Sequence, residues 1–348
     1  MTKIEWTEQS WNPIVGCSVI SPGCTNCYAM RCAGTRLKHT DAYKGLTKPS
    51  KSGPVWTGEM RLNEKALLTP LKRKKPTLYF VNSMGDLFHE NAHYQWIDSV
   101  FAVMALCPQH TFQVLTKRAE RMRRYMFSSQ SMNCVGEAMQ RLGPKPAASI
   151  STVMRQCGAA VGPRARWWPL PNVWLGVSAE DQARANERIP LLLDTPAAVR
   201  FVSCEPLLGP IDLQTLERGA PRGSCSALPC EDGGTYLDWV IVGGESGGGA
   251  RPMYPDWARQ IRDDCARHHV PFFFKQWGDW APGECCPPPT GTSVGASYFA
   301  EKWVYEEVSL RTSEALHVDD EPDVWRVGKR RALKMLDGQS HAQMPEVG

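Results

Sequence analysis

Three cysteines near the amino end of the chain, Cys17, Cys24 and Cys27, have the spacing that most directly suggests chemistry. Six residues separate the first two, and two residues separate the last two. Thiolates this close in sequence, in a loop that contains Pro22 and Gly23, can surround one metal centre. A structural zinc ion takes four ligands in a closed site, and a cubane iron–sulfur cluster usually takes four cysteines. Three cysteines on a cubane leave one iron open to another ligand.

An open iron of this kind is what radical S-adenosylmethionine (SAM) chemistry uses. There the iron binds the amino and carboxylate groups of SAM, and an electron from the cluster cleaves SAM to a deoxyadenosyl radical. The same cysteines also suit a zinc knuckle, for which Cys32 or His39 would supply the fourth ligand. The pairs Cys225/Cys230 and Cys285/Cys286 are candidates for a second metal.

The bulk composition is that of a large globular protein with a mild positive charge. The 348 residues are 42% hydrophobic and carry a formal net charge of +4. Basic residues gather at 72–75, 118–124, 164–168 and 329–331, so a nucleic-acid partner is compatible with the charge but not required by it. The thirteen cysteines follow no signal peptide, and no apolar run is long enough to cross a membrane. We therefore expect a reducing cytoplasm and no membrane partner.

Short apolar segments alternate with helical segments along most of the chain. Strands are predicted at 77–81, 111–115, 173–177, 199–203, 239–242 and 271–275. Helices are predicted at 94–106, 118–125, 181–193 and 254–268. Strands that are apolar on both faces and alternate with helices indicate a parallel sheet, in a βα barrel or an open α/β sheet. We expect a barrel domain over 1–280, with insertions near 128–171 and 218–236, and an extension over 281–348 that packs on it.

Polar residues follow these strands, where a barrel places its chemistry. They are Asn82 to Asp86, Thr116 to Arg118, Ser178 to Glu180, Cys204 and Glu205, Gly243 to Ser246, and Gln276 with Trp277.

Several of these motifs together resemble a phage-associated family of three-cysteine proteins, distantly similar to spore photoproduct lyases within the radical SAM group. The resemblance covers about four-fifths of the chain. It is carried by Glu5-Trp6-Thr7, Trp11-Asn12-Pro13, Gly16-Cys17, Ser21-Pro22-Gly23-Cys24-x-Asn26-Cys27-Tyr28-Ala29, Asn82 to Phe88, Leu115 to Arg118, Trp174 to Ser178, Ser203 to Pro210, Val242 to Gly247 and Phe272 to Gly278.

The resemblance implies a partial (β/α)6 radical-SAM-type barrel, with the cysteine loop after a first strand near 10–15. It also implies a [4Fe-4S] cluster held by Cys17, Cys24 and Cys27, and SAM as the second cofactor. The interval between the first two cysteines is longer here than in the common radical SAM motif, and the family shares this longer loop.

Further site residues follow from the resemblance. Asp86 would contact the methionyl amine of SAM, or else cap a helix. Lys117, Ser178 and Arg188 are candidates for its carboxylate and ribose. Tyr28, Ser83, Gly243 and Gly244 complete the candidate cofactor-binding set. Cys204, Glu205, Glu245 and Lys275, with Gln276 beside them, would face the substrate as catalytic residues.

Three functions remain open at this stage. The first is a radical SAM enzyme that modifies or rearranges a nucleobase, such as an amino-acid-decorated thymine in phage DNA. The second is a radical SAM lyase that repairs DNA photoproducts, and the third is a metal-stabilised nucleic-acid-binding module without activity. Arg164, Arg166, Trp167 and Trp168 would contact the nucleic acid, or the tryptophans would pack on the barrel. Either enzyme would need an electron donor such as a flavodoxin or ferredoxin.

Overall fold

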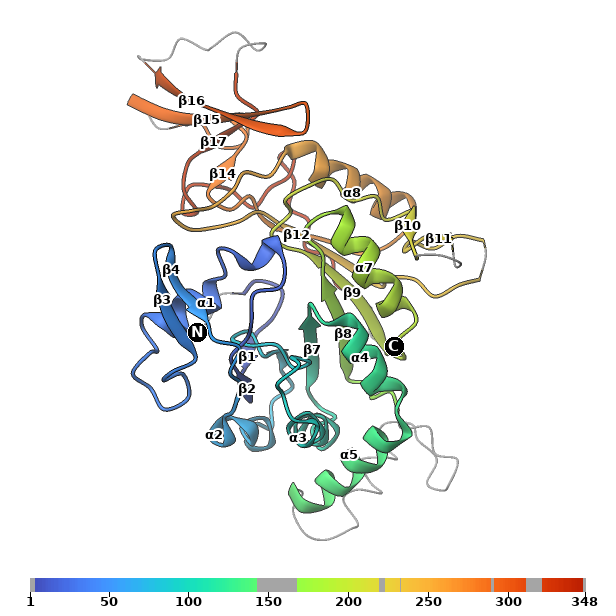
Figure 1. The fold of residues 1–348 in the computed structure, drawn as a ribbon. Coiled ribbons are helices and arrows are strands. Elements are labelled where there is room, and N and C mark those ends of the chain that lie inside the picture. The colour runs from blue at the N-terminus through green and yellow to red at the C-terminus, as the bar shows by residue number, and fades with distance from the viewer. Residues whose placement is uncertain are drawn as a thin grey trace. The chain divides into compact units, whose positions relative to one another are not determined.

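The computed structural model describes residues 4–142, 168–218, 223–231, 233–288, 291–310 and 321–346 (Figure 1). The chain divides into two compact units. Unit 1 comprises Met1–Ser178 and Arg188–Phe201, and unit 2 comprises Ala179–Glu187 and Val202–Gly348. The predicted α/β class is confirmed, because helices alternate with parallel strands in this structure. The boundary expected near residue 280 stays a prediction.

Unit 1 is built on parallel strands that follow one another in chain order. The order is β1 (Gln9–Trp11), β6 (Leu78–Val81), β7 (Thr111–Thr116), β8 (Val173–Ser178) and the first residues of β9 (Val199–Cys204). The first four pair in parallel register. Phe80, Phe112 and Phe201 lie among the buried aromatic side chains of this unit. The sequence predictions of strands at 77–81, 111–115, 173–177 and 199–203 are therefore confirmed.

The first strand expected near 10–15 is two short strands in the structure. After β1 the chain passes Pro13, which has no N–H to donate, and continues as β2 (Ile14–Val15). β2 pairs with β5 (Arg61–Leu62), and β3 (Thr47–Ser50) forms a hairpin with β4 (Gly53–Trp56). Two single turns of 3₁₀ helix, Pro22–Cys24 and Pro70–Lys72, lie in the connecting loops.

The helices of unit 1 include the two that the sequence predicts, α3 (Tyr94–Ala105) and α4 (Ala119–Phe127). Shorter helices are α1 (Tyr28–Gly34) and α2 (Glu64–Leu67). A further helix, α5 (Ser129–Leu142), packs against α3 and occupies the start of the expected insertion. Arg164, Arg166 and Trp167 lie outside the described residues, whereas the Trp168 ring packs 5.3 Å from that of Phe101.

Unit 2 contains the last residues of β9, then β12 (Trp239–Gly243) and β13 (Phe272–Gln276), in that order. β12 and β13 pair in parallel. Helix α8 (Pro255–Arg267) packs on both strands, and α7 (Gln182–Leu193) begins in this unit. A small pair, β10 (Leu216–Glu217) with β11 (Ser224–Cys225), lies in the expected insertion near 218–236. These strands and helices match the sequence predictions for 239–242, 271–275, 181–193 and 254–268.

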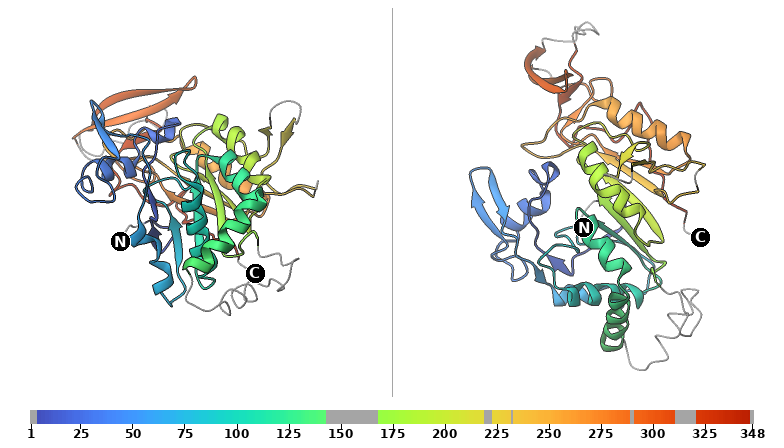
Figure 2. Two further views of the ribbon diagram at one scale, coloured as in Figure 1. Left: turned by 60° about the horizontal axis from the view of Figure 1, so that its bottom comes forward. Right: turned by 45° about the vertical axis from the view of Figure 1, so that its right-hand side comes forward.

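The carboxy-terminal region holds an antiparallel sheet that the sequence analysis did not predict. Its order is β14 (Trp280–Ala281), β17 (Val324–Arg326), β15 (Gly291–Phe299) and β16 (Lys302–Leu310). Figure 2 shows β15 and β16 as a long hairpin in orange and red. Its Trp303 and Tyr298 lie against Trp257 of α8, with Trp257 and Tyr298 rings 4.9 Å apart. Among the described helices, none combines the length and the apolar character needed to cross a bilayer.

Candidate functional site

Gly16 sets the path of the cysteine loop. Its φ is +102°, a conformation that favours glycine, and an added Cβ would lie 2.2 Å from the carbonyl oxygen of Glu59. On the other side Gly85 approaches closely, because its own added Cβ would lie 2.9 Å from the Gly16 carbonyl oxygen. Gly16 and Gly85 form a parallel bridge. Two glycines therefore bring Cys17 beside the loop that follows β6, where Asp86 lies.

Replacing Gly16 with alanine is expected to disrupt this loop. The substitution combines an unfavourable φ with a backbone clash that no side-chain rotation relieves, so we expect a loss of more than about 2 kcal/mol in unfolding free energy. Gly58→Ala is the matched control, since Gly58 has a φ of +86° but open space where its Cβ would lie. The control should lose only about 1 kcal/mol. Chemical denaturation measures both, and equal losses would contradict this role for Gly16.

The three cysteines of the loop are half-buried free thiols in unit 1. Burial, followed by the charge of Asp86, raises the pKa of Cys17 to about 12. Cys27 and Cys24 raise the Cys17 pKa further, while Arg118 lowers it, so these groups share one electrostatic environment. Burial also raises the pKa of Cys27, which lies at the start of α1 and whose carbonyl accepts from Arg31 N.

An apolar floor lies beneath two of the three cysteines. Cys17 and Cys27 pack against a buried cluster that includes Met30, Leu46 and Trp56. Low-dielectric surroundings favour neutral thiols over free thiolates, and metal binding reverses that preference because metal ligands are deprotonated. Within the residues that the structure describes, no three His, Cys, Asp or Glu side chains converge as ligands of one metal ion do. The ligands of a cubane bind different irons and need not converge on one point.

These features fit an iron–sulfur cluster held by three thiolates. The loop supplies three half-buried cysteines, two of which pack against apolar side chains, and a guanidinium donates to one of the sulfurs. Hydrogen bonds to ligating sulfurs and a hydrophobic shell are the usual protein contributions to such clusters. Of the alternative ligands, Cys32 accepts a hydrogen bond from Arg36 Nη2 at 3.1 Å, and His39 is exposed.

Asp86 is a buried carboxylate that accepts hydrogen bonds from the protein itself. Its Oδ1 accepts from Phe88 N at 3.0 Å and from Thr116 Oγ1 at 2.7 Å. Its Oδ2 accepts from Lys117 N at 3.2 Å and from Arg118 Nη1 at 2.9 Å. Asp86 therefore fastens the loop after β6 to the end of β7. The expected contact with SAM stays a prediction, and this fastening role is what the contacts establish.

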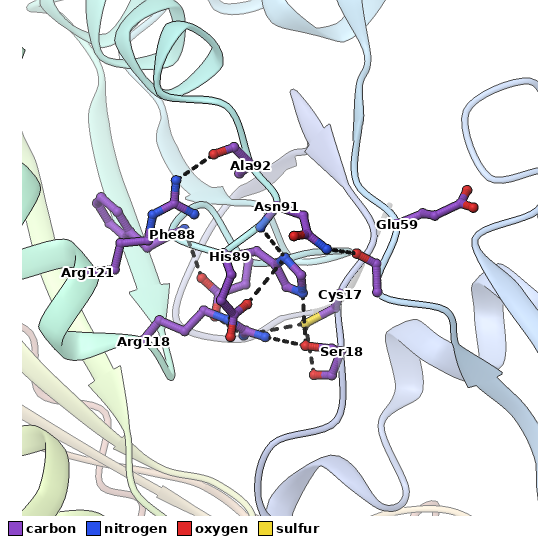
Figure 3. Close-up of polar contacts among 12 residues, drawn as sticks. Cys17, Ser18, Glu59, Phe88, His89, Asn91, Ala92, Arg118 and Arg121 are labelled. Atoms are coloured by element: carbon purple, nitrogen blue, oxygen red, sulfur yellow. Dashed lines mark hydrogen bonds and ion pairs between the residues drawn. The ribbon is translucent and has the colours of Figure 1, made fainter.

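Arg118, which donates to Asp86, also contacts Cys17 and Ser18 of the cysteine loop (Figure 3). Its Nη1 also points to Cys17 Sγ, 3.8 Å away, and its Nη2 donates to Ser18 Oγ at 2.7 Å. His89 Nε2 lies 2.9 Å from the same Ser18 hydroxyl. Because His89 Nδ1 accepts from Asn91 N, we assign the ring proton to Nε2, which then donates to Ser18. Burial, then Arg118, lowers the pKa of His89, which agrees with a neutral ring.

The remaining cofactor candidates of unit 1 form two groups. In the first, Tyr28 Oη donates to the Ser83 carbonyl at 2.7 Å, and Ser83 Oγ donates to Asn12 Oδ1 at 3.2 Å. Lys117 follows β7, its backbone N donates to Asp86 Oδ2 at 3.2 Å, and its charge is among the causes that lower the pKa of Cys27. In the second group, Arg188 is 1% exposed and donates from Nη1 to the Ser178 carbonyl at 2.9 Å. The second contact ties α7 to the end of β8.

Unit 2 brings together most of the predicted substrate-facing residues at the ends of its strands. Lys275 Nζ lies 2.7 Å from Glu205 Oε1, and Ser203 Oγ donates to Glu205 Oε2 at 3.0 Å. The side chains of Lys275 and Glu205 are 21% and 13% exposed, so this ion pair can be reached from solvent. Glu245 instead is buried, and Arg251 holds it with Nε at 2.9 Å and Nη2 at 2.6 Å.

Other candidates in unit 2 have neighbours within the protein that account for their residue types. A Cβ on Gly243 would lie 2.7 Å from Glu205 Oε1, and one on Gly244 would lie 1.9 Å from the Trp277 carbonyl oxygen. Gly244 is thus required by close approach of the backbone, whereas Gly243 leaves room for the Glu205 carboxylate. Cys204 is fully buried, and burial raises its pKa strongly. Gln276 Nε2 donates to Ser246 Oγ at 3.1 Å. Their roles toward cofactor or substrate stay predictions.

Three residues of these networks were not predicted: Ser18, His89 and Arg251. Arg118 was predicted as a polar residue at a strand end, from its position in the Leu115–Arg118 motif, but without a role in the site. It also lies in a basic stretch, and such stretches are usually solvated surface.

Comparison with known proteins gives one match. Residues 1–345 match the model of a family described as "Protein of unknown function (DUF5131)". No curated protein and no solved structure matches the chain.

Proposed function

We propose that this chain, which belongs to the DUF5131 family, is a radical SAM enzyme that modifies or rearranges a nucleobase. The observation that carries this proposal is the cysteine loop, where three half-buried thiols lie close in sequence, two of them pack on an apolar floor and one of these two faces a buried guanidinium. When bound, the [4Fe-4S] cluster and SAM together supply a deoxyadenosyl radical that abstracts hydrogen from an unactivated carbon.

The residues of the chain would hold and surround these cofactors. Cys17, Cys24 and Cys27 would ligate the cluster as thiolates. The ring of Tyr28 is 49% exposed while its hydroxyl is anchored on Ser83, so the ring presents an apolar face that can lie against an adenine. Lys117, whose charge acts on Cys27, would offer a positive charge to the carboxylate of SAM.

We propose that Glu205 and Lys275 contact the substrate. They carry opposite charges, lie 2.7 Å apart and are partly exposed, which suits a pair that binds polar substituents or moves a proton. The substrate class, a nucleobase in DNA, rests on the resemblance described above. A flavodoxin or ferredoxin would deliver the electron.

One incubation tests the proposal as a whole. The chain, loaded anaerobically with iron and sulfide, is mixed with SAM, a reductant and DNA that carries amino-acid-decorated thymine, and the digested nucleosides are analysed by mass spectrometry. The proposal predicts deoxyadenosine together with a nucleoside of altered mass or retention. Deoxyadenosine without any altered nucleoside, across modified and unmodified DNA, would contradict the substrate class. Absence of both products would contradict the enzyme assignment.

Replacing Lys275 with methionine is expected to lower the yield of altered nucleoside on the order of a hundredfold, the usual size of an acid–base contribution. Iron content and SAM cleavage without DNA should be unchanged, because Lys275 is not among the cluster or SAM residues. Lys302→Met on the exposed face of β16 is the control and should behave as the parent. Mass spectrometry of nucleosides measures the effect, and a parental yield from Lys275→Met would remove this residue from the reaction.

A further inference from the structure

Arg118 is a buried cation that donates to two residues of the cysteine loop and to two carboxylates. Its side chain is 6% exposed, and that of its partner Asp86 is 7% exposed. Nε donates to Glu90 Oε2 at 2.8 Å, Nη1 to Asp86 at 2.9 Å and Nη2 to Ser18 Oγ at 2.7 Å. The remaining direction of Nη1 leads to Cys17 Sγ at 3.8 Å.

Contacts with two strand ends fix the position of this guanidinium. Arg118 N donates to Thr116 Oγ1 at 2.9 Å, and the Thr116 hydroxyl donates in turn to Asp86. Arg118 also begins α4, since its carbonyl accepts from Met122 N at 3.1 Å. A planar guanidinium with several fixed donors does not rotate away from one partner without losing others. These contacts therefore hold the positive charge of the Arg118 guanidinium beside Cys17.

We infer that Arg118 is a positioning residue that holds Cys17 and sets the reduction potential of the cluster. This inference rests on the proposed function. A hydrogen bond and a positive charge at a ligating sulfur stabilise the more negative, reduced cluster, and burial strengthens both effects. Asp86 accepts from the same Nη1 that faces Cys17 Sγ, so it holds this nitrogen in place and offsets part of the guanidinium charge.

Ser18 links Arg118 to the conformation of the cysteine loop. It directly follows Cys17, and its hydroxyl is held by both Arg118 and His89 (Figure 3). These two contacts fix the first residue of the interval between Cys17 and Cys24. Arg118 thus acts on the cluster through its ligand and through the loop, and not as a ligand of SAM.

A redox titration of the loaded protein, followed by electron paramagnetic resonance (EPR), tests the inference. Arg118→Gln should lower the ratio of reduced to oxidised cluster at a fixed potential by at least tenfold, which is a shift of about 59 mV for a one-electron couple. Arg118→Lys keeps a charge but cannot reach Asp86, Ser18 and Cys17 together, so it should shift the ratio in the same direction by less. SAM affinity of Arg118→Lys should equal that of the parent.

Arg121→Gln is the matched control, because Arg121 lies on the same helix but donates to the Ala92 carbonyl and lies over the Tyr94 ring. Its titration should match the parent. If Arg118→Gln fails to take up iron, Arg118→Lys decides the question. The inference is overturned if the variant that decides the question has the same reduction midpoint potential as the parent protein. It is also overturned if that variant binds SAM more weakly while its midpoint potential is unchanged. A parent protein that takes up no iron overturns the proposed function instead.

Discussion

Replacing any one of Cys17, Cys24 or Cys27 with alanine is expected to abolish cluster assembly. The cysteine loop offers three thiols as ligands. A cubane cluster that already lacks a fourth protein ligand is not retained by the two thiolates that would remain. Anaerobically reconstituted variants should therefore contain less than about a tenth of the parental iron and sulfide. Each variant should still fold, because the three thiols are only half-buried and each substitution removes a single sulfur.

Cys32→Ala is the matched control for these variants. Cys32 lies on α1, five residues after Cys27, and its sulfur is bound by the Arg36 side chain. Its loss should leave iron and sulfide at the parental level. If Cys24→Ala keeps its full iron and sulfide, the three-ligand assignment is wrong. If Cys32→Ala loses them as the others do, the site takes four cysteines and has no open iron.

The second large effect is expected from Asp86→Ala. The substitution removes a buried carboxylate and leaves the Arg118 charge without its buried partner. Breaking a buried ion pair from one side costs about 3–5 kcal/mol of unfolding free energy. Because Asp86 also fastens the loop after β6 to the end of β7, iron uptake should fall as well. Denaturant unfolding of the metal-free protein measures the first effect without interference from the cluster.

Glu90→Ala is the control, since Glu90 pairs with the same arginine but has a side chain that is 61% exposed. An exposed pair contributes about 0–1 kcal/mol, so this variant should unfold close to the parent. Equal losses for the two variants would show that Arg118 does not depend on its buried partner. An Asp86→Ala protein that keeps its stability and iron but binds SAM weakly would restore the expected role of Asp86 as a SAM contact.

The parallel strands were predictable because each is a short apolar run, and most of them stand next to a helix with clear periodicity. Trp239–Gly243 and Phe272–Gln276 are of this kind. The carboxy-terminal sheet was not predictable in the same way. Its strand Gly291–Phe299 is rich in glycine and serine, which are not typical of strands, and it is defined by pairing with Lys302–Leu310. That pairing depends on a turn at Ala300 and Glu301, both with positive φ.

Spacing alone predicts the three cysteines of the candidate site, but it does not predict their surroundings. A run of arginines at 118–124 looks like a surface for phosphate. In the structure Arg118 is buried, Arg121 lies over Tyr94, and Arg123 and Arg124 pair with Glu120. Likewise Gly243 and Gly244 suggest room for a ligand, whereas the chain itself fills that room. Contacts between distant segments decide such roles, and a single sequence does not contain them.

The most direct test of the central claim is the EPR spectrum of the reduced protein with and without SAM. The chain is reconstituted anaerobically with iron and sulfide, reduced, and measured before and after SAM is added. A [4Fe-4S] cluster with one open iron predicts a cluster signal whose shape changes when SAM binds. A chain that holds stoichiometric zinc and gives no cluster signal, or a cluster signal that SAM leaves unchanged, would contradict the account.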